Sequence, residues 1–348
     1  FTYNRLKNFD RNYSGNNQGR STSLTDYIVN ISDGFHHYDL GSDDRYYSNA
    51  GAPWLGILGW NTYLMNQAQA PNGSLYDDAY QSILNEGERV DSRMKSHERG
   101  YIEAYDFSVG TNFSNNLFFG VTFAITDMYY RLSSTYEEYF QQGGGLDLDN
   151  YLETSGSGYQ MKVGAIYRPT DHIRLGVSYH SPTWYVMRDI YQATMTPYDI
   201  YYEDNKGIDQ LAKSETTPDH AYWDYRFRTP YSWTFSAAAI LGTRAILSAD
   251  YEIKDYSCMN LKDNSGYDLQ ADNEVIKEDF SWANQLRLGF EYKFTPQFSG
   301  RVGYAWMSNP YTEDFKKGRV EVMTAGTVPQ YTIEGDVHNL TAGLGYRF

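Results

Sequence analysis

The final residues of the chain alternate between apolar and small or polar side chains with a strict period of two. Residues of this kind at every second position are typical of a β-strand with one apolar face and one polar face. The segment 339–348 is therefore predicted to be a strand. Its apolar face consists of Leu340, Ala342, Leu344, Tyr346 and Phe348.

The same alternation recurs along the rest of the chain. In segments 159–168 and 173–180 it is interrupted only by the turn-forming residues 169–172, so these segments are expected to be antiparallel neighbours. Counted in this way, the pattern predicts about ten strands. They are the segments 1–10, 101–113, 117–126, 159–168, 173–180, 233–241, 245–253, 286–294, 302–306 and 339–348.

Short turns and long connections alternate between these strands. The turns lie near Asn115, Pro169, Thr243 and Pro296. Outer-membrane barrels have short periplasmic turns and long extracellular loops, so a periplasmic Phe348 places all four turns in the periplasm. By the same count residues 1–10 run outward, and we expect either an even number of strands missing before them or a barrel of about ten. The predicted extracellular connections are 11–99, 139–151, 197–221, 259–276 and 312–331.

The connection 11–99 is the longest, and loops of such length are usually functional. It contains a predicted helix at 23–31, with Ser23 or Thr25 as the N-cap. An apolar run follows at 53–65. A second helix is predicted within the polar segment 85–99.

Composition agrees with membrane strands. The chain is 41% hydrophobic with a mean hydropathy of −0.64, and no run approaches the ~18 apolar residues of a membrane helix. Strands that cross a bilayer must close on one another. The 17% of aromatic residues suits girdles at the membrane interfaces, although a soluble β-sandwich can also be rich in tyrosine. We therefore predict an all-β fold, an antiparallel transmembrane β-barrel with long extracellular loops, as a single domain over 1–348 in a Gram-negative outer membrane.

The net charge and the cysteine content exclude a nucleic-acid-binding protein and a disulfide-bonded one. The net charge of −15 opposes nucleic-acid binding, which needs a basic surface. The single cysteine, Cys258, excludes an internal disulfide. No signal peptide precedes Phe1, and we interpret the opening as lacking the natural N-terminus.

Several segments resemble the FadL family of outer-membrane transporters for long-chain fatty acids and other hydrophobic compounds, in a Bacteroidetes-like branch. The resemblance is carried by Gly164-Ala165-Ile166-Tyr167, by Arg174-Leu175-Gly176-Val177-Ser178-Tyr179-His180-Ser181-Pro182, and by the later strands. Those later segments are Leu286-Arg287-Leu288-Gly289-Phe290-Glu291-Tyr292, Arg301-Val302-Gly303-Tyr304 and Gly343-Leu344-Gly345-Tyr346-Arg347-Phe348.

The family resemblance implies a fourteen-stranded barrel plugged by an N-terminal hatch, with the hatch and the first strands absent from this chain. It implies that segment 11–99 helps to form an outer hydrophobic groove, and that Phe348 is an end signal for the barrel-assembly machinery. The other expected partners are membrane lipid, lipopolysaccharide, a hydrophobic small molecule and partner proteins of a larger outer-membrane complex.

An apolar cluster in the long connection is the first candidate site. Exposed apolar surface of this kind marks binding sites, and a ligand groove uses the same residue types as a loop core that packs on itself. Both interpretations stay open, because spacing does not separate them. The cluster comprises Trp54, Leu55, Ile57, Leu58, Trp60, Tyr63, Leu64 and Met65.

Inward-facing cations are the second candidate site. Alternation places Lys162, Arg174, Arg287 and Arg301, together with Arg347, on the lumen side. One of them could pair with a ligand carboxylate, Arg174 or Arg287 before the others. The alternative, ion pairing with Asp250, Glu252 and Glu291, is favoured because buried charges are normally paired.

No metal, cofactor or catalytic site is predicted. His36 and His37 are adjacent, and in an extended chain they would face opposite ways and could not share a metal. His180 is a lone lumen histidine, and the acidic stretch 263–274 lacks the ligand spacing of a calcium loop. No catalytic motif occurs, so the chain is not expected to be an enzyme.

Passive uptake of hydrophobic compounds is the leading functional hypothesis. The alternatives are a barrel subunit of a protein-export or surface complex, and a general porin. A porin should conduct ions freely, whereas a FadL-like protein should conduct poorly and bind fatty acid.

Overall fold

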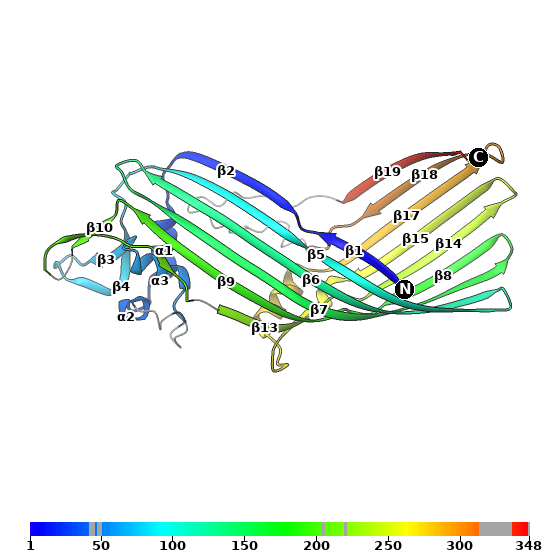
Figure 1. The fold of residues 1–348 in the computed structure, drawn as a ribbon, viewed down its shortest axis with the longest axis horizontal. Helices are drawn as coiled ribbons and strands as arrows, with labels where there is room; N and C mark the ends of the chain where they lie inside the picture. Colours follow the sequence, from blue (N-terminus) through cyan, green and yellow to red (C-terminus); the bar gives the residue numbers. More distant parts are fainter. Residues whose placement is uncertain (42–45, 47–50, 204–205, 219–220, 313–335, 347–348) are drawn as a thin grey trace.

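A large antiparallel sheet dominates the computed structural model, which describes residues 1–41, 46, 51–203, 206–218, 221–312 and 336–346. Ten strands follow one another along this curved wall (Figure 1), which confirms the predicted all-β, antiparallel strand architecture. They are β1 (Thr2–Asn8), β5 (Val90–Phe113), β6 (Leu117–Phe140), β7 (Gly145–Thr170), β8 (Ile173–His180), β14 (Ser232–Leu241), β15 (Ala245–Asp255), β17 (Trp282–Lys293), β18 (Phe298–Met307) and β19 (Val337–Tyr346).

Some wall strands continue beyond a short break. Strand β2 (Arg11–Arg20) pairs with β5 in line with β1, and β9 (Trp184–Tyr198) pairs with β7 in line with β8. Further along the wall, β13 (Ala221–Arg228) pairs with β9 and with β16 (Asn260–Asp263). Within the described residues, β1 and β19 are the two ends of the strand order and do not pair with each other.

The alternation of side chains across the wall is regular. The ladders between β5, β6 and β7 contain no register shift. Even-numbered residues of these strands therefore share one face and odd-numbered residues the other. The even face includes Val90, Tyr136 and Leu148, which pack against the helices, so we call it the inner face and the odd face of these strands the outer face.

The two ends of the wall differ (Figure 1). The turns at 114–116, 171–172, 242–244 and 294–297 lie at one end, as predicted. Helices α1, α2 and α3 lie at the other end of the long strands. In the part of the chain that the structure describes, no helix is both long and apolar enough to cross a membrane.

Three predicted loop features are wrong. The segment 139–151 is not a long connection, because β6 ends at Phe140 and β7 begins at Gly145. The polar segment 85–99 is not helical, because β5 begins at Val90 and pairs with β6 over its whole length. The connection predicted at 11–99 is shorter than expected, because β2 and β5 occupy its two ends.

The remaining excursion, 21–89, forms a small unit with its own apolar core. It contains α1 (Leu24–Ser32), α2 (His37–Leu40), α3 (Trp54–Asn61) and the hairpin β3 (Met65–Gln69) and β4 (Leu75–Ser82). Ser23 caps α1 in a capping box with Asp26, which confirms the helix and one of the two N-caps predicted. Leu24 and Ile28 of α1 are buried against α3 and the inner face of the wall.

The other long connections carry short elements. Segment 197–221 contains a two-stranded ribbon and a short strand that pairs with β9, and segment 259–276 contains part of a helix. Most of the predicted connection 312–331, the predicted inward cation Arg347 and Phe348 lie outside the described residues. The elements are β10 (Tyr201–Glu203), β11 (Asp209–Leu211), β12 (Glu215–Thr216), η2 (Tyr256–Cys258) and α4 (Gln270–Asp279).

Candidate functional site

An apolar band covers the outer face near the turn end of the wall. In the outer rows of β5 to β8 these side chains are all exposed, and Phe123 keeps 47% of its surface accessible. A contiguous apolar surface of this extent marks contact with another apolar medium or molecule. The band includes Phe107, Val109, Phe113, Phe119, Val121, Phe123, Ile125, Tyr159, Met161, Leu175 and Val177.

The inner face behind this band is hollowed by glycines. Gly110, Gly120 and Gly164 are consecutive partners across β5, β6 and β7. A Cβ atom added to Gly120 would meet no heavy atom closer than 4.0 Å, so the missing side chain leaves open space. The resulting groove over Gly120 and Gly164 has a volume of about 520 Å³, within the usual range for small-molecule sites.

This glycine groove is amphipathic along its length. Phe118 and Ile166 line it towards the turns. Lys162 and His180 line it towards the helices. The apolar stretch over the glycines suits the body of a hydrophobic ligand.

Most of the predicted inward cations are paired. Lys162 Nζ lies 3.0 Å from Asp106 Oδ1, Arg287 Nη2 lies 3.1 Å from Glu252 Oε2, and Arg301 Nε lies 2.8 Å from Glu291 Oε2. The predicted ion pairing is thus confirmed for Glu252 and Glu291. Asp250 faces Arg287 in the ladder between β15 and β17, yet it forms no ion pair within the described residues.

Arg174 differs from the other three cations. Its side chain is exposed on the inner face of β8, two residues along the strand from the groove residue Gly176. Within the described part of the chain it has no ion-pair or hydrogen-bond partner. A guanidinium in this condition is available to an incoming carboxylate.

The predicted apolar cluster of the long connection forms the core of the 21–89 unit. Leu55, Ile57, Leu58, Leu64 and Met65 are at most 2% exposed, while Trp54, Trp60 and Tyr63 are partly buried around them. The aromatic members contact the rest of the molecule, since Trp54 meets Tyr191 of β9 with ring centroids 5.2 Å apart, and Tyr63 stacks on Tyr202 at 3.8 Å.

A buried carboxylate, which no pattern in the sequence indicated, joins this unit to the wall. Glu138 lies on the inner face of β6 and is fully buried. Its carboxylate accepts hydrogen bonds from Ser23 Oγ, from the Leu24 N–H at 2.9 Å, and from Tyr136 at 2.6 Å. An anion at a helix N-terminus is favourable, but burial still raises the pKa of Glu138.

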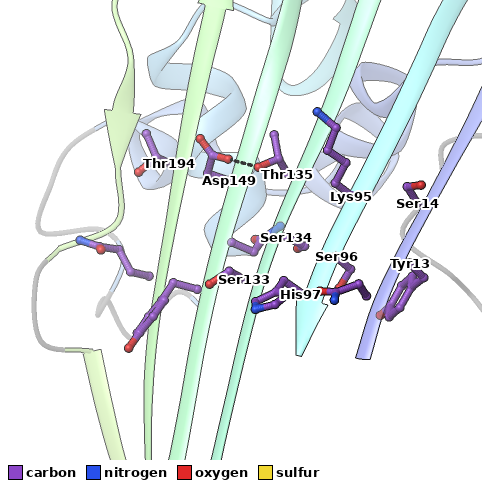
Figure 2. A pocket seen from close by; sticks show the side chains of 14 residues that line it. Tyr13, Ser14, Lys95, Ser96, His97, Ser133, Ser134, Thr135, Asp149 and Thr194 are labelled. Atoms are coloured by element: carbon purple, nitrogen blue, oxygen red, sulfur yellow. Dashed lines mark hydrogen bonds between the residues drawn. The ribbon is translucent and has the colours of Figure 1, made fainter. Parts of the chain in front are cut away.

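A second hollow lies on the wall nearer the helices, and it was not predicted. Figure 2 shows its polar lining, contributed by β2, β5, β6, β7 and β9. Its volume is about 710 Å³. Lys95, Thr135 and Asp149 stand in one cross-strand row, and Thr135 Oγ1 donates to Asp149 at 2.6 Å. These residues are odd-numbered, so this polar groove belongs to the outer face.

The geometric argument against a shared metal at His36 and His37 is wrong. His36 has extended backbone angles, but it is the N-cap of α2 and the helix begins at His37, so the extended conformation does not continue through the pair. Their rings are stacked, with centroids 4.5 Å apart. Together with Asp77 of β4 they form a cluster of metal-ligating side chains.

Known structures supply the comparison for this fold. Neither a family model nor a curated protein matches the chain. It is similar to the crystal structure of a Pseudomonas aeruginosa FadL homologue, at 12% identity and a TM-score of 0.45, over 95% of this chain and 87% of that one. It is also similar to the monoaromatic hydrocarbon channel CymD, at 13% identity and a TM-score of 0.38, over 75% and 68% of the two chains.

A third similar structure is that of the Pseudomonas putida toluene transporter TodX, at 14% identity and a TM-score of 0.36. This match covers 80% of the present chain and 64% of TodX. The family named from the sequence motifs is thus represented among the structural matches, and at these identities the likeness concerns the fold.

Proposed function

We propose that this chain forms the wall of an outer-membrane channel for passive uptake of hydrophobic compounds, with the apolar band facing lipid. Lipid-facing strands of such barrels carry apolar side chains outward and leave the inner face to the permeant. The short turns would lie in the periplasm and the 21–89 unit outside the cell. Movement down a gradient requires no catalytic group.

The ligand class that fits best is an amphiphile with one carboxylate, such as a long-chain fatty acid. Its hydrocarbon chain would lie over Gly120 and Gly164, against Phe118 and Ile166. Its carboxylate would pair with Arg174. The observation that carries the proposal is the glycine-floored groove lined by Phe118 and Ile166, with the Arg174 guanidinium, unpaired among the described residues, two residues along the strand from its edge.

The paired state of the other cations supports this choice of anchor. A ligand carboxylate at Lys162 or Arg301 would have to displace Asp106 or Glu291 from contacts of 3.0 and 2.8 Å. At Arg287 it would compete with Glu252. Removing one partner of such a pair leaves a charge uncompensated, so these sites bind a carboxylate less well than Arg174.

Capture at the cell surface would involve the 21–89 unit. Its aliphatic residues are buried, so we assign the first contact with ligand to the partly exposed rings of Trp54, Trp60 and Tyr63. Movement of these rings would open the apolar cluster behind them. This step remains distinct from the proposed site at Arg174.

A second candidate function is a barrel subunit of a protein-export or surface complex. The outer polar groove around Lys95 and Asp149 favours it, because this surface lies beyond the apolar band and offers hydrogen-bonding groups to a partner chain. Isolation of a stable complex from membranes, lost when Lys95 and Asp149 are both changed to alanine, would support this function.

Matched ligands test the channel proposal. We would measure binding of oleate and of oleyl alcohol, which differ only in the head group, to the purified full chain in detergent by isothermal titration. Arg174→Gln is expected to weaken oleate binding about tenfold, equivalent to about 1.4 kcal/mol, and to leave oleyl alcohol unchanged. Arg301→Gln serves as the control, because Arg301 is already paired.

Two results would contradict the proposal. Equal weakening of oleate binding and oleyl alcohol binding in Arg174→Gln would exclude a contact between Arg174 and the ligand carboxylate. Large, ohmic conductance of the protein in planar bilayers, without saturable binding of either ligand, would instead indicate a general porin.

A further inference from the structure

Two histidines and one aspartate of the 21–89 unit converge away from the channel wall. His36 and His37 lie at the start of α2, and Asp77 lies in β4. One ligand atom from each residue lies within 4.8 Å of the other two. Among the described residues this is the single group of three or more such side chains close enough to hold one ion.

The spacing of the cluster is near that of a coordinated ion. Ligand atoms placed tetrahedrally at about 2.0–2.2 Å from zinc lie about 3.4 Å from one another. Small side-chain rotations would bring the present atoms to that spacing. The Asp77 side chain is 71% exposed and free to turn, and His37 Nδ1 already lies 3.8 Å from Asp77 Oδ1.

The surroundings favour a cation and hold the histidines in place. Asp33, Asp39, Asp77 and Asp78 all act electrostatically on the nearby Tyr80 hydroxyl, which shows how densely negative charge is grouped here. Tyr80 donates a hydrogen bond to the Phe35 main-chain oxygen at 2.7 Å and thereby fixes the residue before His36.

The histidine rings also take part in local packing. His37 contacts Trp60 of α3, with ring centroids 6.2 Å apart. The Tyr38 N–H donates to His36 Nδ1 at 3.2 Å, and a metal bound at that nitrogen would replace this hydrogen bond. These contacts hold the rings close to the positions from which small rotations would bring their nitrogens to one ion.

We propose that His36, His37 and Asp77 bind one zinc ion, which would join α2 to the β3–β4 hairpin. Two imidazole nitrogens and one carboxylate oxygen form a ligand set that zinc accepts, and a water molecule would complete the tetrahedron. The ion would restrain a unit whose elements are short. This site is independent of the proposed transport function.

The test is zinc titration of the purified, metal-stripped full chain at pH 7.5 by isothermal calorimetry. We expect one saturable site, weakened at least about tenfold by His37→Asn and by Asp77→Asn. Asp78→Asn is the matched control, since it removes the same charge next to the ligand and should change affinity less than about threefold.

Cobalt supplies a readout of geometry that is independent of affinity. Tetrahedral Co²⁺ absorbs far more strongly in the visible range than the hydrated octahedral ion, so an intense spectrum lost in His36→Asn would support the site. A wild-type spectrum like that of hydrated cobalt would overturn it. Equal zinc affinity of the wild type and the His37→Asn and Asp77→Asn variants, with native circular dichroism for all three, would overturn it as well.

Discussion

The contact between Glu138 and helix α1 makes a quantitative prediction. Glu138 is fully buried and receives hydrogen bonds from Ser23 Oγ, the Leu24 N–H and the Tyr136 hydroxyl. In Glu138→Ala the carboxylate disappears, and no other acceptor for the Leu24 N–H is found among the described residues. The helix would then be held to the wall by apolar packing alone.

The magnitude follows from the groups left behind. The Ser23 hydroxyl can turn towards Thr25 Oγ1, which lies 3.0 Å away. A buried donor without a partner costs about 1–3 kcal/mol, and the substitution leaves two, the Leu24 N–H and the Tyr136 hydroxyl. We therefore expect the opening free energy of the 21–89 unit to fall by about 2–6 kcal/mol. Glu138→Gln retains the volume and one acceptor oxygen, so its effect should be less than half as large.

Hydrogen exchange of the α1 amides, followed by mass spectrometry, measures this local opening. A loss of about 2–6 kcal/mol corresponds to exchange roughly 30-fold to 20,000-fold faster in Glu138→Ala. The control is Glu137→Ala, because Glu137 lies on the opposite face. Its ion-pair partner among the described residues is Arg93 at 3.8 Å, a contact worth about 1 kcal/mol or less. Equal exchange of α1 in the two variants would refute the argument.

Two further predictions concern pH and backbone conformation. Burial raises the pKa of Glu138 above 4.5, so the folded state holds the proton of this carboxyl more tightly than the unfolded state does. The stability of the 21–89 unit should therefore fall as pH rises from about 4.5 through the folded pKa. Glu138→Gln should abolish this pH dependence, measured by hydrogen exchange of the α1 amides after correction for intrinsic exchange rates. Gly100→Ala should sharply lower the folded yield, scored by heat-modifiable gel migration, because φ is +143° and the new Cβ would lie 2.1 Å from the Tyr129 main-chain oxygen. Gly110→Ala, with 3.5 Å of clearance on the same strand, should fold normally.

The wall was predictable where its two faces differ chemically. From 117 to 126 every odd residue is apolar and exposed or half-buried on the outer face, while Gly120 and Thr122 face inward. Alternation of this kind identifies a strand without reference to its neighbours. The ten-strand count and the short turns therefore followed from the sequence.

The outer halves of the long strands were not predictable in the same way. In 90–99 and 130–140 polar residues occupy both faces, because the outer face beyond the apolar band no longer needs apolar side chains. The strands continue there because the backbone of β5 finds hydrogen-bonding partners in β2 and β6. Such pairing depends on residues distant in sequence, and a polar window such as 85–99 then resembles a helix or loop.

The same dependence on distant residues explains which site residues could be identified from the sequence. Arg174 is identified by parity alone, because a period of two places a strand residue on the inner face whatever lies opposite. Whether its guanidinium can bind a ligand depends on the side chains of the other strands, because Lys162 on the same face is already paired with Asp106. Glu138 obeys the same parity, yet its role arises only because β6 extends far enough for its even face to meet the N-terminus of α1. The local pattern thus shows which residues lie on the inner face. Whether a charged side chain there is ion-paired, is available to a ligand or contacts a helix depends on strand length and register, which the whole sheet determines.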